Sequence, residues 1–425
     1  MSALSAKLTP FTSHLLFKKS LIYKATYQLL QLVDVPIKFE DYNHIYVDVS
    51  VFAKADNQTG IQRVVREVIF EMLNHPLTTN KINFVIATKK KPYRTVPFTF
   101  KDNHIQFEIN KDKTPIIPIN LSRGDVFIGL DFCPNIIPSH LLQLVRWRMQ
   151  GAVISWVIYD LLPLHHPEWF PDATQGNFEP WLKTVLLTGN RLFTISNKVA
   201  KDITTYAQKQ LKIELPENIV QKVPLGYLFS PKITIYKNFI DDLIKKELSQ
   251  KKFILMVGTL EPRKGHLDII TAFDQRLDSN ANDLLLVIAG KKGWKTQMLI
   301  EKIQKDKNIM WLEDMGDAAL IWLYQKCQGV ILASYDEGFG LPLLEAMAFN
   351  KYILARDIPI FREVSHNYNN IDFFLSNNID LTHKLNIWVN IITTTTPINE
   401  GFNLEQYTWK KTVSTIIKAL SFYRE

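Results

Sequence analysis

Residues 333–348 read ASYDEGFGLPLLEAMA, and they are the most informative segment of this chain. The segment follows an apolar run typical of a strand buried on both faces, and it opens an apolar pattern typical of a helix. Gly338 and Gly340 allow a tight turn whose backbone N–H groups can approach a ligand closely. Pro342 suits a first helical turn, where a missing N–H costs nothing. A helix that begins at such a turn offers N–H donors to an anionic group such as a pyrophosphate.

Two glutamates flank this turn, Glu337 in the loop and Glu345 in the predicted helix. A carboxylate accepts hydrogen bonds from two hydroxyls at once, so one glutamate suits a donated sugar and the other a ribose. A glycine turn before an acidic helix start also occurs where no ligand binds. The complete string with both carboxylates is far more specific than a lone glycine motif, and it favours a nucleotide-sugar site.

A second cluster, VGTLEPRKG at residues 257–265, ends another apolar run. Ligands of parallel α/β sheets bind outside the carboxyl ends of the strands, so Arg263 and Lys264 would stand where a diphosphate needs neutralising. Fixed cations there would stabilise the charge that a departing nucleoside diphosphate develops. Taken alone, this cluster would equally suit a solvated basic turn.

Apolar runs of strand length alternate with helical patterns along the whole chain, which predicts the α/β class with two doubly wound, Rossmann-like domains. The expected strands are His44–Val49, Asn83–Ala87, Asp125–Gly129, Val153–Ile158, Arg191–Ile195, Ile219–Val223, Phe253–Val257, Leu284–Ala289, Asn308–Leu312, Gly329–Ala333 and Tyr352–Ala355. The expected parts are an N-terminal extension (1–40), a first domain on the acceptor side (41–228), a polar linker (229–252), a second domain that binds the nucleotide sugar (253–403) and a C-terminal helix (404–425).

Composition limits the class of protein and its partners. A chain of 425 residues suits two domains. The net charge of +8 favours anionic partners, but the basic residues are spread along the chain, which argues against nucleic acid. Cys133 and Cys327 lie in apolar surroundings typical of buried thiols and of a reducing compartment. No signal peptide and no spanning apolar stretch is apparent, so a cytoplasmic protein is expected.

The N-terminal extension has one suggestive pattern. Apolar residues recur at helical spacing from Leu15 to Val33, with Lys18, Lys19 and Lys24 interleaved. A basic amphipathic helix of this kind can lie on an anionic membrane, here at the inner face of the cell membrane. The same pattern also describes a helix packed on the first domain.

With these residues in view, the chain resembles the retaining glycosyltransferases of family 4, which have the GT-B fold, most strongly over Phe253–Val364. The family's signature of two glutamates separated by seven residues matches Glu337 and Glu345, and its phosphate-side lysine matches Lys264. The stretch AGKKGW at 289–294 is similar to a subgroup that builds bacterial surface polysaccharides. The resemblance implies two Rossmann-like domains that face each other across a cleft.

The first half carries further matches to this family. DNQTGIQR at 56–63 resembles the family's first-strand loop, which implies that Gly60 approaches the diphosphate. YDLLP at 159–163 resembles a segment that lines the cleft, which implies that Asp160 lies near the acceptor. The residues that the resemblance places on the acceptor side are Tyr159, Arg63 and Ser196.

Two positions depart from the family pattern. Many relatives carry an arginine where this chain has Thr259, and Arg263 is expected to take over part of that role. Many carry a histidine where this chain has Tyr159, so no catalytic histidine is transferred to it. His165 and His166 follow at an offset that does not match.

The resemblance implies a hexose transfer from a nucleotide sugar, GDP-mannose first, to a hydroxyl of a glycan or lipid-linked acceptor, with retention of configuration. Cell-surface polysaccharide or lipopolysaccharide synthesis is the expected context. Catalytic roles fall on Glu337, Lys264, Arg263 and Asp160, and donor-binding roles on Glu345, Gly338, Phe339, Gly340, Leu341, Gly60 and Thr259.

No cofactor and no metal are expected, because the chain has no Asp-x-Asp motif of the kind that holds a nucleotide through a divalent cation. An oxidoreductase is disfavoured, because neither first strand is followed by a Gly-x-Gly-x-x-Gly turn. The remaining alternative is a catalytically silent protein of the same fold that binds or scaffolds glycans.

Overall fold

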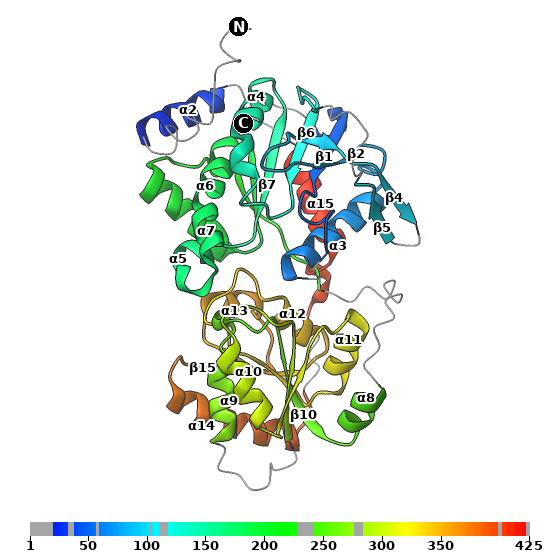
Figure 1. The fold of residues 1–425 in the computed structure, drawn as a ribbon, viewed down its shortest axis with the longest axis vertical. Coiled ribbons are helices and arrows are strands. Elements are labelled where there is room, and N and C mark those ends of the chain that lie inside the picture. The colour runs from blue at the N-terminus through cyan, green and yellow to red at the C-terminus, as the bar shows by residue number, and fades with distance from the viewer. Residues whose placement is uncertain are drawn as a thin grey trace. The chain divides into compact units, whose positions relative to one another are not determined.

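The computed structural model describes residues 20–32, 38–56, 59–101, 104–109, 118–227, 242–275, 284–397 and 402–421 (Figure 1). The chain divides into two compact units. Unit 1 comprises Met1–Pro167, Asp172–Gly226 and Tyr407–Glu425, and unit 2 comprises Glu168–Pro171 and Tyr227–Gln406. One short passage, Glu168–Pro171, therefore belongs to unit 2 although unit 1 surrounds it in sequence, and the C-terminal passage returns to unit 1.

Unit 1 is built on a seven-stranded sheet with the order β3-β2-β1-β6-β7-β8-β9. All neighbouring strands pair in parallel except β3, which pairs antiparallel with β2. Its strands are β1 (His44–Asp48), β2 (Ile82–Ile86), β3 (Arg94–Thr95), β6 (Asp125–Gly129), β7 (Val153–Ile158), β8 (Arg191–Thr194) and β9 (Val220–Lys222). β6 and β7 are buried at every position, as expected for central strands covered on both faces.

The helices of unit 1 lie on both sides of this sheet, with α3 and α15 on one side and α4 and α6 on the other (Figure 1). They are α2 (Ser20–Leu32), α3 (Gly60–Asn74), α4 (Leu141–Met149), α5 (Leu162–His165), α6 (Asp172–Thr188), α7 (Asn197–Tyr206) and α15 (Trp409–Leu420). A separate hairpin joins β4 (Phe98–Lys101) to β5 (His104–Phe107). The C-terminal helix α15 is tied to this unit, because Thr412 donates to the Pro224 carbonyl at 2.6 Å and Arg191 to that of Ala419 at 2.8 Å.

Unit 2 is built on a six-stranded parallel sheet with the order β12-β11-β10-β13-β14-β15. Its strands are β10 (Lys252–Val257), β11 (Leu284–Ala289), β12 (Ile309–Leu312), β13 (Gly329–Leu332), β14 (Tyr352–Arg356) and β15 (Ile371–Phe374). Its helices are α8 (Asp242–Ser249), α9 (His266–Asp274), α10 (Gln297–Lys305), α11 (Asp317–Lys326), α12 (Leu341–Ala348), α13 (Pro359–Val364) and α14 (Asn378–Thr394). α9, α10 and α14 gather on one side of the sheet, and α8 and α11 on the other (Figure 1). The strand order is that of dinucleotide-binding Rossmann domains.

The predicted α/β class with two Rossmann-like sheets is confirmed, and each of the expected strands is present with ends shifted by one residue at most. The sequence missed the short strands β3, β4, β5 and β15, which carry no long apolar run. Of the expected linker, residues 229–241 lie outside the described residues, while α8 and the first residue of β10 occupy its later part. Leu15, Lys18, Lys19 and Val33 of the N-terminal pattern also lie outside them.

One glycine tests how closely the unit 1 sheet is packed. A Cβ at Gly129 on β6 would lie 1.9 Å from the ring of Trp156, its buried partner on β7. We expect Gly129→Ala to destabilise unit 1 by about 1–3 kcal/mol, because the indole cannot move away in a packed core. In the control Gly176→Ala on α6, nothing lies within 4 Å of the new Cβ, and a gain of about 0.5–1 kcal/mol is expected. Thermal unfolding measures both, and equal shifts for the two variants would contradict the packing argument.

Candidate functional site

The site lies where the strand order of unit 2 reverses, between β10 and β13. Ligands of open α/β sheets bind at this switch point, outside the carboxyl ends of the strands. The loop after β10 runs from Gly258 to Gly265. The loop after β13 covers residues 333–340, and we call it the donor loop after the role that the sequence predicts for it. The amide of Tyr335 donates to the carbonyl of Arg263 at 2.9 Å and joins the two loops.

Gly265 lets these loops approach each other. Its φ of +66° lies in the left-handed region, and an added Cβ would stand 2.3 Å from the carbonyl oxygen of Ala333. A side chain at this position would therefore be strained and would also push the donor loop away. The glycine brings the 3-10 turn at Pro262–Lys264 against the loop that carries Glu337.

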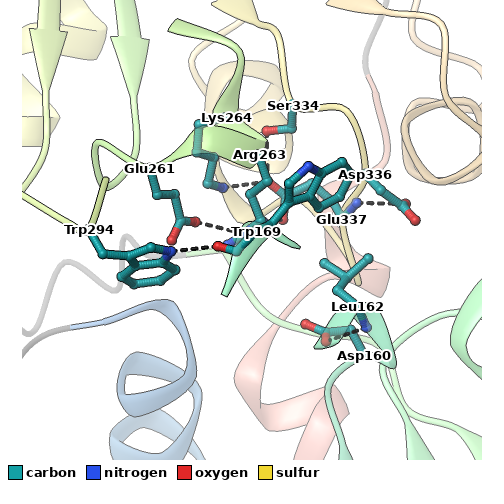
Figure 2. Close-up of polar contacts among 10 residues, drawn as sticks. All are labelled: Asp160, Leu162, Trp169, Glu261, Arg263, Lys264, Trp294, Ser334, Asp336 and Glu337. Atoms are coloured by element: carbon teal, nitrogen blue, oxygen red, sulfur yellow. Dashed lines mark hydrogen bonds and ion pairs between the residues drawn. The ribbon is translucent and has the colours of Figure 1, made fainter. Parts of the chain in front are cut away.

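A cluster of charges, with Glu337 buried and Arg263 and Lys264 half-buried, joins the two loops (Figure 2). The guanidinium of Arg263 lies 2.8 Å from one carboxylate oxygen of Glu337, and the ammonium of Lys264 contacts the other. Ser334 donates its hydroxyl to the same carboxylate at 2.8 Å. The Glu337 side chain is only 10% exposed, so these interactions act in a poorly solvated place. The sequence-predicted residues Arg263, Lys264 and Glu337 are thus brought together.

The charges of this cluster set the ionisation of its acids. Burial by itself would raise the pKa of Glu337, but Arg263 and Lys264 outweigh it and hold the pKa at about 2. The carboxylate of Glu261 lies 2.6 Å from Nε of Arg263, but here the effect of burial on the pKa exceeds that of the cations. Burial raises the pKa of Glu261 even though Arg263 and Lys264 act to lower it. Glu337 therefore carries the firmly fixed negative charge of the site.

A third loop, after β11, packs on the first. Leu260 donates its amide to the carbonyl of Lys291 at 2.9 Å, and Gly293 donates to the carbonyl of Leu260 at 3.0 Å. A Cβ at Gly290 would lie 1.9 Å from the carbonyl oxygen of Gly258, so only glycine fits there. Half-buried Thr259 lies in the middle of this backbone layer.

The donor loop ends at the start of α12. Gly340 has φ +93°, and its added Cβ would meet the ring of Phe361 at 2.9 Å. Pro342 stands in the first turn of the helix, as the sequence predicted. Gly338 and Phe339 are buried, and Leu341 is half-buried. The predicted glycine turn before a helix is therefore present.

Glu345 has an environment that the sequence did not indicate. Its side chain is fully buried in α12, and the hydroxyl of Tyr324 on α11 donates to its carboxylate at 2.7 Å. The Tyr324 ring in turn stacks on Phe349 with centroids 5.5 Å apart. Tyr324 and Glu345 come from different helices and share no motif, so the sequence offered no signal for this pair.

His266 is a second residue of the site that the sequence missed. It is buried at the start of α9, and neither ring nitrogen has a hydrogen-bond partner within the described part of the chain. Burial and the charge of Lys264 lower its pKa to about 3. The imidazole is therefore neutral at physiological pH and leaves the positive charge of the turn to its neighbours.

Unit 1 places its predicted site residues in varied surroundings. Gly60 begins α3, where no atom of the described residues would lie within 4 Å of an added Cβ, and Arg63 follows, half-buried, in the same helix. Asp160 accepts from the amide of Leu162 at 3.0 Å (Figure 2). Asn57 and Gln58 of the predicted loop lie outside the described residues.

Tyr159 and Ser196 are engaged inside unit 1. Buried Tyr159 donates its hydroxyl to the carbonyl of Leu130 at 2.7 Å. Buried Ser196 caps α7 by accepting from the amide of Val199 at 3.1 Å. An acceptor-side role for these two residues stays a prediction.

The switch point of unit 1, between β1 and β6, carries a buried acid pair that the sequence missed. Asp48 accepts from the Ser50 hydroxyl at 2.5 Å and from the Tyr93 hydroxyl at 2.8 Å. Asp131 accepts from the amides of Val51 and Phe52 at 2.7 and 2.6 Å. Burial, and after it the charge of Asp131, raises the pKa of Asp48 to about 7. These bonds fix the backbone just after β1.

The described residues contain neither a cluster of metal ligands nor a membrane-spanning helix. Within the ranges that the structure describes, no group of three or more His, Cys, Asp or Glu side chains is arranged to hold a metal ion. In those same ranges, no helix combines the length and apolar character needed to cross a bilayer. Independence of metal stays a prediction.

Residues 239–390 match the family model of group 1 glycosyl transferases, a range that includes the site described above. The serotype-specific mannosyltransferase WbdA of Escherichia coli is 31% identical over 387 residues, which cover 88% of this chain and 45% of WbdA. The O-antigen chain mannosyltransferase RfbU of Salmonella typhimurium is 28% identical over 214 residues, which cover 49% of this chain and 54% of RfbU. The chain thus spans about half the length of these relatives.

Among solved structures, HepE of Anabaena in complex with UDP and glucose superposes with a TM-score of 0.59 at 14% identity. The match covers 90% of this chain and 100% of HepE. At this identity the likeness concerns the fold alone, and it confirms the predicted GT-B class.

The ionised state of Glu337 predicts a pH signature. Its pKa of about 2 lies below the ordinary 4.5, so its ion pairs stabilise the folded state above pH 4.5, and this contribution disappears as the pH falls toward 2. We expect Glu337→Gln to cost on the order of 3 kcal/mol at neutral pH, because two cations lose their partner.

Thermal unfolding of the unaltered protein and of Glu337→Gln across a pH series measures the gap between their free energies of unfolding. It should stay constant from pH 8 to pH 5 and narrow below, whereas Asp372→Asn, at an exposed position of β15, should open no such gap. A gap as wide at pH 3 as at pH 7 would show that Glu337 is not held ionised by its neighbours.

Proposed function

We propose that this chain, a member of the group 1 glycosyl transferases through residues 239–390, moves a hexose from a nucleotide sugar to a hydroxyl of a glycan or lipid-linked acceptor. The observation that supports it most is the cluster of Glu337, Arg263 and Lys264 at the switch point of unit 2. GDP-mannose is the first donor candidate, because WbdA is a serotype-specific mannosyltransferase and RfbU is an O-antigen chain mannosyltransferase. Cell-surface polysaccharide or lipopolysaccharide synthesis is the corresponding context.

The two cations would hold the diphosphate of the donor. In the structure Glu337 balances the charges of Arg263 and Lys264, so an arriving diphosphate would exchange with the carboxylate as their partner. Glu337, held ionised, would then accept hydrogen bonds from hydroxyls of the donated sugar. As the bond to the diphosphate breaks, the fixed cations would stabilise the growing negative charge without having to reorganise.

The donor loop and α12 would bind the rest of the donor. Gly338 to Leu341 bring backbone amides toward the start of α12, where a phosphate is favoured. We propose Glu345 as the partner of the ribose, with Thr259 lying along the nucleotide. Because Glu345 has no exposed surface in the structure, donor entry must move side chains that cover it.

We further propose transfer with retention and without a metal. The bond from the anomeric carbon to the phosphate oxygen breaks, and a bond to the acceptor oxygen forms on the same face. The acceptor proton passes to the departing phosphate oxygen, so the protein contributes position and charge. Asp160 and Gly60 would act from unit 1, Asp160 near the acceptor and Gly60 near the diphosphate.

Purified protein tests this proposal with GDP-, UDP- and dTDP-sugars. Calorimetry with each nucleotide in excess chelator identifies the base, and NMR of the product gives the anomeric configuration. We expect transfer with retention, and a kcat/KM at least about 100-fold lower in Lys264→Ala, because one fixed cation is lost from the transition state. Lys305→Ala, at an exposed position of α10, is the matched control and should be unaffected.

Three outcomes would count against parts of this proposal. Inversion at the anomeric carbon would exclude the same-face mechanism. Loss of activity in chelator would require a metal. A folded protein that binds none of the nucleotides and transfers no sugar would favour the catalytically silent scaffold instead.

We also propose that α2 rests on an anionic membrane surface. One face of this helix packs on unit 1, where Tyr23 donates to the Lys183 carbonyl at 2.7 Å. The opposite face is apolar and open, with Leu21 79%, Leu29 52% and Leu32 75% exposed. The packed face of α2 agrees with the interpretation of a helix packed on the first domain. The open apolar face supports the proposed contact with a membrane. This exposed apolar face, with Lys24 beside it, suits insertion at the boundary between headgroups and acyl chains.

Sedimentation with vesicles of anionic lipid measures this contact. Replacing Leu21, Leu29 and Leu32 together by serine should lower the affinity for vesicles at least about tenfold, because three apolar side chains that would transfer from water into the lipid are removed. The control Ile379→Ser removes an apolar side chain that is 87% exposed in unit 2 and should leave binding unchanged. Equal sedimentation of all three proteins would contradict the proposal.

A further inference from the structure

A four-residue segment, Glu168–Pro171, belongs to unit 2 although the residues on both sides of it in sequence belong to unit 1. It follows α5 and precedes α6, and it presents two aromatic side chains in succession, Trp169 and Phe170. We call Glu168–Pro171 the aromatic segment. Nothing in the nucleotide-sugar motifs assigns it a role.

The aromatic segment is anchored to the loop after β11 (Figure 2). The indole N–H of Trp294 donates to the carbonyl of Trp169 at 2.5 Å, and the ammonium of Lys295 donates to that of Glu168 at 2.8 Å. Phe170 packs on Trp294 with ring centroids 6.2 Å apart. Two side chains of unit 2 thus bind successive carbonyls of the segment and fix its backbone.

This anchoring sets the Trp169 side chain against the donor loop. Its ring stacks on Tyr335 with centroids 6.1 Å apart and planes 27° from parallel. Tyr335 stands two positions before Glu337, and its amide forms the bond to Arg263 that joins the two loops of the site. The stacked ring therefore touches the donor loop next to its ion-pair cluster.

Tyr335 is also held from within unit 2. The guanidinium of buried Arg356 lies 4.2 Å from the centre of the Tyr335 ring, and its Nε donates to the carbonyl of Ala333 at 2.8 Å. Asp268 on α9 accepts from the Tyr335 hydroxyl at 2.7 Å and pairs with Arg356 at 2.6 Å. The Tyr335 hydroxyl and the backbone before Tyr335 are thus fixed, and Trp169 adds an aromatic contact to a residue that is still 38% exposed.

We infer that Trp169 is a positioning residue for the donor site, acting through Tyr335 on the loop that carries Glu337. The expected effect of Trp169 on donor binding rests on the proposed function. The expected effect of Trp169 on the order of the donor loop is independent of that function, because it concerns the loop without ligand. A stack between aromatic rings contributes enough beyond area burial to shift a loop between ordered and open states by about two- to tenfold. The donor site would then depend on a segment remote from it in sequence.

Hydrogen exchange in the full chain without ligand tests the structural part. In Trp169→Ala, amides of the donor loop should exchange several-fold faster than in the unaltered protein, while those of β11 should not change. Trp169→Phe, which keeps an aromatic ring, should restore slow exchange. Phe402→Ala is the matched control, because Phe402 also packs on a tyrosine of unit 2, Tyr368, at 5.8 Å.

Steady-state transfer tests the functional part with the same variants. We expect Trp169→Ala to raise the donor KM about tenfold and to leave the acceptor KM unchanged, with Trp169→Phe close to the unaltered protein. Donor-loop exchange and donor KM that do not respond to Trp169→Ala, in a protein that transfers sugar, would overturn the inference alone. Faster exchange in a protein that transfers nothing would retain the positioning role of Trp169 and overturn the proposed function.

Discussion

The site depends on a carboxylate held between two cations in a place that water hardly reaches. Glu337 is buried, which by itself disfavours its charge, and it stays ionised only because Arg263 and Lys264 lie beside it. The same geometry serves the cations, whose mutual repulsion is relieved by the carboxylate. Such a triad is costly to desolvate and easily disturbed when one member is removed. The strand order that brings two loops together, and the glycine at 265 that lets them touch, are the conditions for its existence.

Both units are built on mainly parallel sheets whose strand order reverses at a switch point, but the charged residues at the two switch points differ. In unit 2, cations gather after β10 and meet an acid after β13. In unit 1, the corresponding loops carry Asp48 and Asp131, which are satisfied by hydroxyls and backbone amides. Burial raises the pKa of both acids, and the hydrogen bonds that they accept fix the backbone after β1. Under the proposed function, the cations beside Glu337 in unit 2 would be the charge partners of a diphosphate.

The sequence predicts the sheets well because central parallel strands are almost wholly apolar, as in β7 and β11, and short apolar runs between turn residues are typical of such strands. It also assigns Arg263, Lys264 and Glu337 to one donor site, since ligands of a parallel sheet bind outside the carboxyl ends of its strands, but it does not predict the ion pairs among them. It does not predict Tyr324 beside Glu345, or Arg356 and Trp169 beside Tyr335. These contacts join residues from different elements, and each residue taken alone fits an ordinary helix, strand or loop. The sequence also misses short strands such as β15, because their place in the sheet depends on pairing with a neighbouring strand and not on a long apolar run of their own.

The two signature glutamates, although only eight positions apart, are prepared for a ligand in different ways. Under the proposed function, a diphosphate would replace Glu337 as the ionic partner of Arg263 and Lys264. Glu345 lies in the body of α12 with a phenol at 2.7 Å and no exposed surface, so a ribose could reach it only after the side chains that cover it move. The first process would depend on charge and would be opposed by salt, while the second would depend on packing around Tyr324 and Phe349. A donor that engaged both glutamates would therefore couple an exchange of ion pairs in the donor loop to a packing change between α11 and α12.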